Sequence, residues 1–212
     1  MYITRLKIAL HVSVVLMVLS LCLSLFDNSL FCWHPVLMSA GYLLFMSEGI
    51  IAAIMFRHID GHDRVHAIWG HAWLQLRSVL CIAAGFAAIY RNKVLHGKTH
   101  FHSLHAKVGL ATLILSVLSP LWGLLSFKRL GVIQKFPEKW HPWIKWSHRQ
   151  MGVLCWLLAL VTIQLALRHP AVDKGLLTNV WQVAVAVIGG LMLMLLIKAW
   201  ARAEEDVVAK AV

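Results

Sequence analysis

The sequence predicts an all-α membrane protein, a bundle of six transmembrane helices. The 212-residue chain is 60% hydrophobic and only 14% charged, whereas about 25% of the residues of a soluble domain are charged. The apolar residues also fall in six long blocks without the alternation of membrane β-strands. Because the bilayer offers no water to backbone groups, only helices and closed barrels can cross it, and this pattern favours helices.

Each block is long enough to cross the roughly 30 Å of hydrocarbon at about 1.5 Å per residue. The first is too long for the apolar core of a signal peptide and lacks a small-residue cleavage site. The second and third carry Glu48 and Arg77 at equal depth, which predicts a buried ion pair, with a proton path as the functional alternative. The fourth contains Pro120, which is expected to bend it. The fifth and sixth blocks are predicted to be helices from their length and apolar composition alone. The predicted helices cover residues 8–26, 35–56, 68–90, 107–127, 148–167 and 178–200 of a single domain, 1–212.

The formal net charge is +11, and the basic residues lie mainly in the connections between the apolar blocks. This distribution indicates membrane flanks and not a nucleic-acid surface. Lys and Arg are more frequent in the segments on the side of the two termini, so the positive-inside rule predicts that both termini are cytosolic. The four cysteines are scattered, with no CxxC motif, which predicts free thiols and argues against a zinc site or a covalently attached haem.

Four of the 13 histidines fall at the starts of four successive helices: His34, His71, His105 and His148. Because successive helices run in opposite directions, His34 and His105 share the outer side of the membrane, while His71 and His148 share the inner side. Two imidazoles at each of two depths is the arrangement that two bis-histidine haems require. Histidines at helix ends also serve as interfacial anchors, and this alternative remains open from spacing alone.

Several motifs around these histidines resemble the cytochrome b561 family, in particular its short members that consist of the core alone. Residues 31–38 read FCWHPVLM and resemble the start of that family's second helix. Residues 71–76 (HAWLQL), 102–105 (HSLH) and 147–149 (SHR) are similar to the starts of its third, fourth and fifth helices. The resemblance extends over most of the chain, from about residue 8 to residue 200.

The resemblance implies two haems b per chain within the central four helices. His34 and His105 would bind the outer iron, and His71 and His148 the inner iron, with His66 as a second candidate on the inner side. It further implies electron transfer from cytosolic ascorbate to monodehydroascorbate or ferric iron on the opposite side. Family members commonly form homodimers, and an endomembrane or vesicle membrane is the expected location. The sequence departs from the ascorbate-using branch at residues 53–58 and 61–66, which are less densely basic and aromatic.

Basic residues beside the predicted haems are candidates for substrate binding. They could equally pair with haem propionates or flank the membrane. The inner candidates are Arg57, Arg64, Lys145 and Arg149, and the outer candidates are Lys98, His100, His102 and Lys107.

Two other functions compete with a transmembrane ascorbate-dependent reductase. A haem-free transporter or proton channel lined by histidines would need further polar residues inside the helices, and Glu48 and Arg77 are the notable ones. A cytochrome b anchor subunit that serves a quinone and a partner dehydrogenase would share the haems but would not react with soluble ascorbate.

Overall fold

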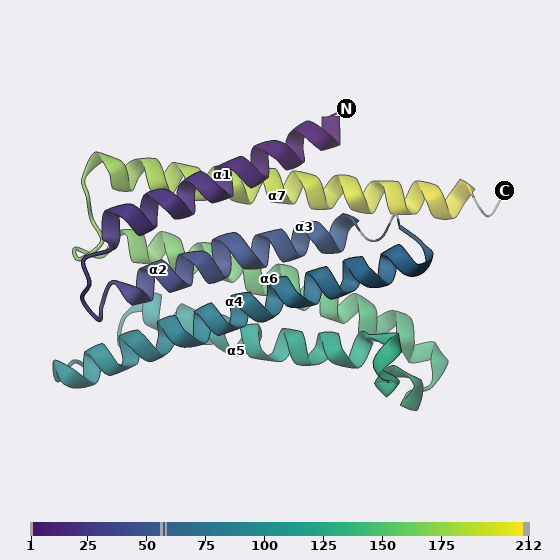
Figure 1. The fold of residues 1–212 in the computed structure, drawn as a ribbon, viewed down its shortest axis with the longest axis horizontal. Helices are drawn as coiled ribbons and strands as arrows, with labels where there is room; N and C mark the ends of the chain where they lie inside the picture. Colours follow the sequence, from purple (N-terminus) through teal and green to yellow (C-terminus); the bar gives the residue numbers. More distant parts are fainter. Residues whose placement is uncertain (1, 56, 58, 210–212) are drawn as a thin grey trace.

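A computed structural model describes residues 2–55, 57 and 59–209, and every regular element in these ranges is helical (Figure 1). Six helical segments are long and apolar enough to cross a membrane, which confirms the predicted fold class. The first five spans are residues 3–25, 33–55, 61–95, 104–126 and 138–167, and the sixth is 176–201.

Several helices extend further than their apolar blocks. Helix α4 covers Gly61–Leu95, α6 covers His141–Leu167 and α7 covers Leu176–Ala209. Hydropathy detects only the part of a helix inside the hydrocarbon, and backbone hydrogen bonds continue through the polar headgroup layer. The predicted end of the second helix at residue 56, and residue 58 of the adjoining stretch, lie outside the described residues.

The second crossing is not a uniform α-helix. It consists of α2 (Trp33–Ser39), a π-helical segment η1 (Ala40–Met46) and α3 (Ser47–Met55). A π segment accommodates an extra residue within an otherwise α-helical rod, and such segments are frequent at functional sites.

The helices form two hairpins and one accessory pair. The α2–η1–α3 rod packs against α4, and α5 (Leu104–Ser126) packs against α6. The accessory pair is α1 (Tyr2–Leu25) with α7, side by side along one flank of the bundle (Figure 1). Both termini lie at one end, together with three short 3-10 turns before α6, and this end is called the inner end below. The turns are η3 (Lys128–Leu130), η4 (Val132–Lys135) and η5 (Glu138–Trp140).

The apolar core lies between the accessory pair, the α2–η1–α3 rod and α6. Trp156 is fully buried in it, and its indole N–H donates to Ser47 Oγ at 2.9 Å. In α5, by contrast, the buried residues are Thr112, Ser116 and Ser119. Large apolar side chains such as Leu23 (81% exposed) cover the outside, as a lipid-facing surface requires.

Candidate functional site: two histidine pairs

The four helix-start histidines form two opposed pairs between the hairpins. His34 of α2 faces His105 of α5 near the outer end, with ring centres 6.2 Å apart and an interplanar angle of 79°. His71 of α4 faces His148 of α6 near the inner end, at 6.4 Å and 81°. A metal–imidazole bond of about 2 Å, plus about 1 Å from nitrogen to ring centre, places two axial imidazoles about 6 Å apart. Each pair therefore fits one metal ion between its rings.

Each imidazole is oriented by a backbone carbonyl of the other helix in its own hairpin. Because a carbonyl only accepts, Nδ1 must donate in every case, which leaves the lone pair on Nε2 for a metal. Histidine ligands of metals are generally held in this way. The acceptors are Gly85 O for His34 (3.1 Å), Gly49 O for His71 (2.7 Å), Thr162 O for His105 (3.0 Å) and Ser119 O for His148 (3.1 Å).

The acceptors repeat at a regular spacing along the helices. Fourteen positions separate His71 from Gly85 on α4, and the same spacing recurs on α5 and α6. This spacing sets the two pairs about 21 Å apart along the helix axes. The rod α2–η1–α3 has fifteen positions between His34 and Gly49. The π segment η1 lies between them and absorbs the additional residue, so both ends of the rod remain in register with α4.

Three glycines allow the close approaches on which this geometry depends. A Cβ at Gly85 would lie 3.1 Å from the Leu37 side chain, so the missing side chain lets α4 approach α2. A Cβ at Gly49 would collide with the Gln75 amide. At Gly123, a Cβ would lie 2.8 Å from Cε1 of His148 and 3.2 Å from its Nε2. The glycine thus provides the space in which this imidazole sits.

A cavity at the outer end contains the first histidine pair. Its lining includes Lys98 and His100, two of the sequence-predicted candidates, and His100 stacks on Tyr90 with ring centres 4.3 Å apart. His102 and Lys107 are exposed and do not line it. Sequence reasoning missed further polar lining residues from two different segments: Asn92 and Lys93 on α4, and His169 after α6.

At the inner end, two of the four predicted cations lie within each other's electrostatic reach. Burial, and next the positive charge of Arg149, lower the pKa of Arg57 from its ordinary value. Neither guanidinium has a carboxylate partner in the described part of the chain. Arg64 instead lies 3.8 Å from the exposed Asp60, its own helical neighbour, and Lys145 is exposed. A pair of cations held together without an acid is a suitable site for an anion.

The structure bears on three predictions about individual side chains. The expected ion pair between Glu48 and Arg77 is wrong: Glu48 lies 2.7 Å from Nδ1 of His11, and Arg77 is exposed. Equal depth on two helices does not fix the direction in which a side chain points. His66 makes an edge-to-face contact with His62, with ring centres 4.3 Å apart, whereas His71 is the residue opposite His148. The four cysteines are free thiols, as predicted.

Comparison with known proteins agrees with this architecture. The sequence model of eukaryotic cytochrome b561 matches residues 33–172, a range that contains all four paired histidines. The chain belongs to the eukaryotic cytochrome b561 family. This confirms the resemblance drawn from the motifs and makes the protein a multi-pass membrane oxidoreductase of the electron-transfer type.

Three relatives illustrate the range of the family. The chain is 28% identical to the bovine (Bos taurus) transmembrane reductase CYB561D2, over 79% of this chain and 75% of the relative. It is 29% identical to probable ascorbate-specific transmembrane electron transporter 2 of rice (Oryza sativa subsp. japonica), over 75% and 68% respectively. It is also 29% identical to the zebrafish (Danio rerio) lysosomal membrane ascorbate-dependent ferrireductase CYB561A3, over 62% and 51%.

Proposed function

We propose that this cytochrome b561 protein carries electrons through the membrane on two haems b, from ascorbate at the inner end to monodehydroascorbate or a ferric chelate at the outer end. The observation that carries the proposal is the orientation of the four imidazoles. Every Nδ1 is engaged by a carbonyl, and the rings oppose each other at 6.2 and 6.4 Å. His34 with His105, and His71 with His148, would hold the two irons.

Bis-histidine haem supplies reversible one-electron transfer and leaves no open position on the iron for a substrate. The protein's own residues therefore have three tasks in this proposal. They orient the ligands through the four carbonyls, hold the two sites at a fixed separation, and bind the donor beside the inner pair and the acceptor beside the outer pair. The buried helix interior keeps bulk water from the path between the pairs.

At the inner end, Arg57 and Arg149 would bind ascorbate. Ascorbate is an anion at neutral pH and releases one electron and one proton when it becomes monodehydroascorbate. Two guanidiniums without an acidic partner attract such an anion and can donate hydrogen bonds to its oxygens. Arg64 and Lys145 would contribute long-range attraction only, because Arg64 is paired with Asp60 and the charge that acts on Arg57 is that of Arg149.

At the outer end, Lys98 and His100 would bind the acceptor. Both line the cavity that contains His34 and His105, so a small anion or chelate bound there lies close to the outer haem. Lys93 lines the same cavity, and its ammonium donates to the Thr99 carbonyl at 2.9 Å. This bond ties α4 to the loop that carries Lys98 and His100.

Orientation, location and assembly complete the proposal. The excess of basic residues at the inner end supports cytosolic termini, and with them a cytosolic donor. The zebrafish relative carries a lysosomal name, which supports an endomembrane or vesicle location. The chain would act as a homodimer.

Proteoliposomes loaded with ascorbate test the proposal directly. With a ferric chelate and a ferrous-specific dye outside, the wild-type protein should form ferrous iron at a rate well above that of empty vesicles. His71→Gln should abolish this reaction, while His66→Gln on the same helix should preserve it. Equal rates with and without protein would contradict the proposal, and activity in His71→Gln would contradict the assignment of the inner ligand.

A further inference from the structure

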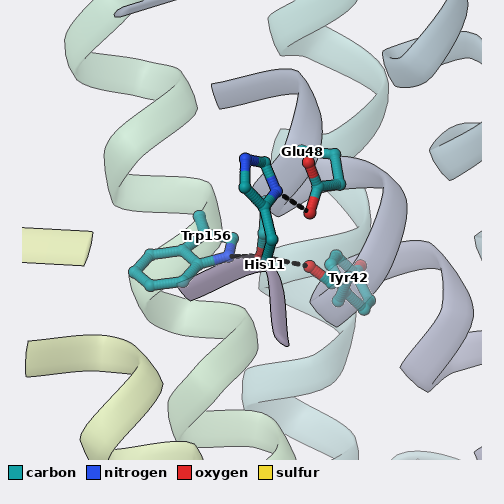
Figure 2. A network of polar contacts seen from close by, with 5 residues as sticks. His11, Tyr42, Glu48 and Trp156 are labelled. Atoms are coloured by element: carbon teal, nitrogen blue, oxygen red, sulfur yellow. Dashed lines mark hydrogen bonds and ion pairs between the residues drawn. The ribbon is translucent and has the colours of Figure 1, made fainter. Parts of the chain in front are cut away.

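A histidine–carboxylate contact lies inside the membrane region, away from both histidine pairs. His11 Nδ1 of α1 is 2.7 Å from Glu48 Oε1 of α3 (Figure 2). The two residues lie nine positions from the start of α1 and seven from the end of α3, or about 10–14 Å from the helix ends. Ionisable groups at such depth are costly, and those that persist usually have a function.

The contact leaves one nitrogen of the imidazole available to a proton. With the carboxylate as acceptor, Nδ1–H of His11 donates, and its Nε2 has no hydrogen-bond partner within the described residues. The His11 side chain is 42% exposed on the protein surface. Binding one proton at Nε2 changes the net charge of the pair from −1 to 0.

The His11–Glu48 contact is linked to the proposed inner haem site through one residue, Gly49. Gly49 follows Glu48 directly, and its carbonyl accepts the Nδ1–H of His71. The backbone here is held in place because Ser47 Oγ accepts the indole N–H of Trp156 and donates to Tyr42 O at 3.5 Å (Figure 2). An electron that reaches the inner site adds a negative charge to this low-dielectric region, and a nearby proton would compensate it.

We propose that His11 and Glu48 form a proton-binding site that takes up one proton when the inner haem is reduced. This inference rests on the proposed haem between His71 and His148. Ascorbate would supply the electron, the haem would hold it, and one proton from water at the inner end would bind to Nε2 of His11. When the electron moves to the outer haem, the proton is released.

Other titratable side chains near His11 and Glu48 contact residues outside this pair. Tyr42 and Cys155 each share a contact with Ser116, and the Lys7 ammonium lies 3.2 Å from the Met55 sulfur. The titratable side chains on the surrounding elements include Lys7 on α1, Tyr42 on η1, His71 and Arg77 on α4, Cys155 on α6 and Lys198 on α7. His11 itself lies outside residues 33–172, the part that matches the family.

Redox titration of the purified holoprotein at several pH values tests the site. Chemical mediators replace ascorbate, so a defect in ascorbate binding does not affect the result. The midpoint potential of the inner haem should fall as pH rises, with a slope of up to about 59 mV per pH unit, the value for one proton per electron. His11→Asn, which keeps a donor to Glu48 but cannot titrate, and Glu48→Gln should both flatten this slope. His66→Gln is the matched control and should not.

A second readout does not depend on the potential. The reduced-minus-oxidised infrared spectrum should contain imidazole bands that disappear in His11→Asn and remain in His66→Gln. Visible spectra establish that each variant binds two haems, and Glu48→Gln provides the test if His11→Asn does not fold. Slopes and bands unchanged in both variants would overturn this inference alone. A protein without haem would overturn the proposed function together with it.

Discussion

The most specific prediction concerns Gly123, the residue packed against the imidazole of His148. In Gly123→Ala the new methyl carbon would lie 2.8 Å from Cε1 of that ring. Carbon atoms prefer separations of about 3.5–4.0 Å, so the ring must move by roughly 0.7 Å or more. It cannot move freely, because its Nδ1 donates to Ser119 O and the ring is opposed by His71, 6.4 Å away between ring centres.

Overpacking of this kind costs about 1–3 kcal/mol, which corresponds to a roughly 5- to 150-fold loss of affinity for the inner haem. Haem titration of the purified apoprotein, with the haem-to-protein ratio at saturation, measures this loss. Gly152→Ala is the control, because a Cβ there would lie 3.7 Å from Ser119 Oγ, an ordinary contact. If Gly123→Ala binds both haems with wild-type affinity and unchanged spectra, the deduced position of the ligand ring is refuted.

Three further predictions follow from the same geometry. His34→Ala should retain only the inner haem and His71→Ala only the outer one, so each should show one haem per chain and a single midpoint potential in a redox titration. Deletion of Leu44 from the π segment should preserve both haems, because His34 and Gly49 would then have the fourteen-residue spacing found on α4. A one-residue deletion from the matching stretch of α4 should eliminate haem binding. Equal outcomes for the two deletions would show that the π segment does not set the register of the two helices. Arg57→Gln should raise the KM for ascorbate roughly 5- to 10-fold with little change in kcat, whereas Arg64→Gln should leave it nearly unchanged; the reverse order would disprove the anion site.

Much of this fold could be predicted from the sequence because the bilayer permits few kinds of structure. Uninterrupted apolar blocks of helical length have few alternatives, and the alternating direction of successive helices is then determined. With that, the depth of each helix-start histidine follows, and His34 is expected opposite His105 for topological reasons alone. The structure indeed brings these two rings together.

The direction in which a side chain points around its helix axis could not be predicted from the sequence. Glu48 and Arg77 share a depth, but they point in different directions, and Glu48 contacts His11 instead. The π segment is equally invisible in a sequence that is apolar on all sides, since no periodicity reveals an inserted residue. The only sign of the inserted residue is the fifteen-position spacing from His34 to Gly49, and this can be interpreted only when the carbonyl acceptors are known.

In the proposed function, four carbonyl-oriented histidines hold two haems that ascorbate can reduce. The visible spectrum of the detergent-purified protein, recorded with a haem-to-protein ratio before and after addition of ascorbate, tests it most directly. We predict sharp low-spin α and β bands, about two haems per chain, and rapid reduction by ascorbate. Absence of haem would contradict the claim as a whole, and haem that only dithionite reduces would contradict ascorbate as the donor and favour a quinol or a partner protein.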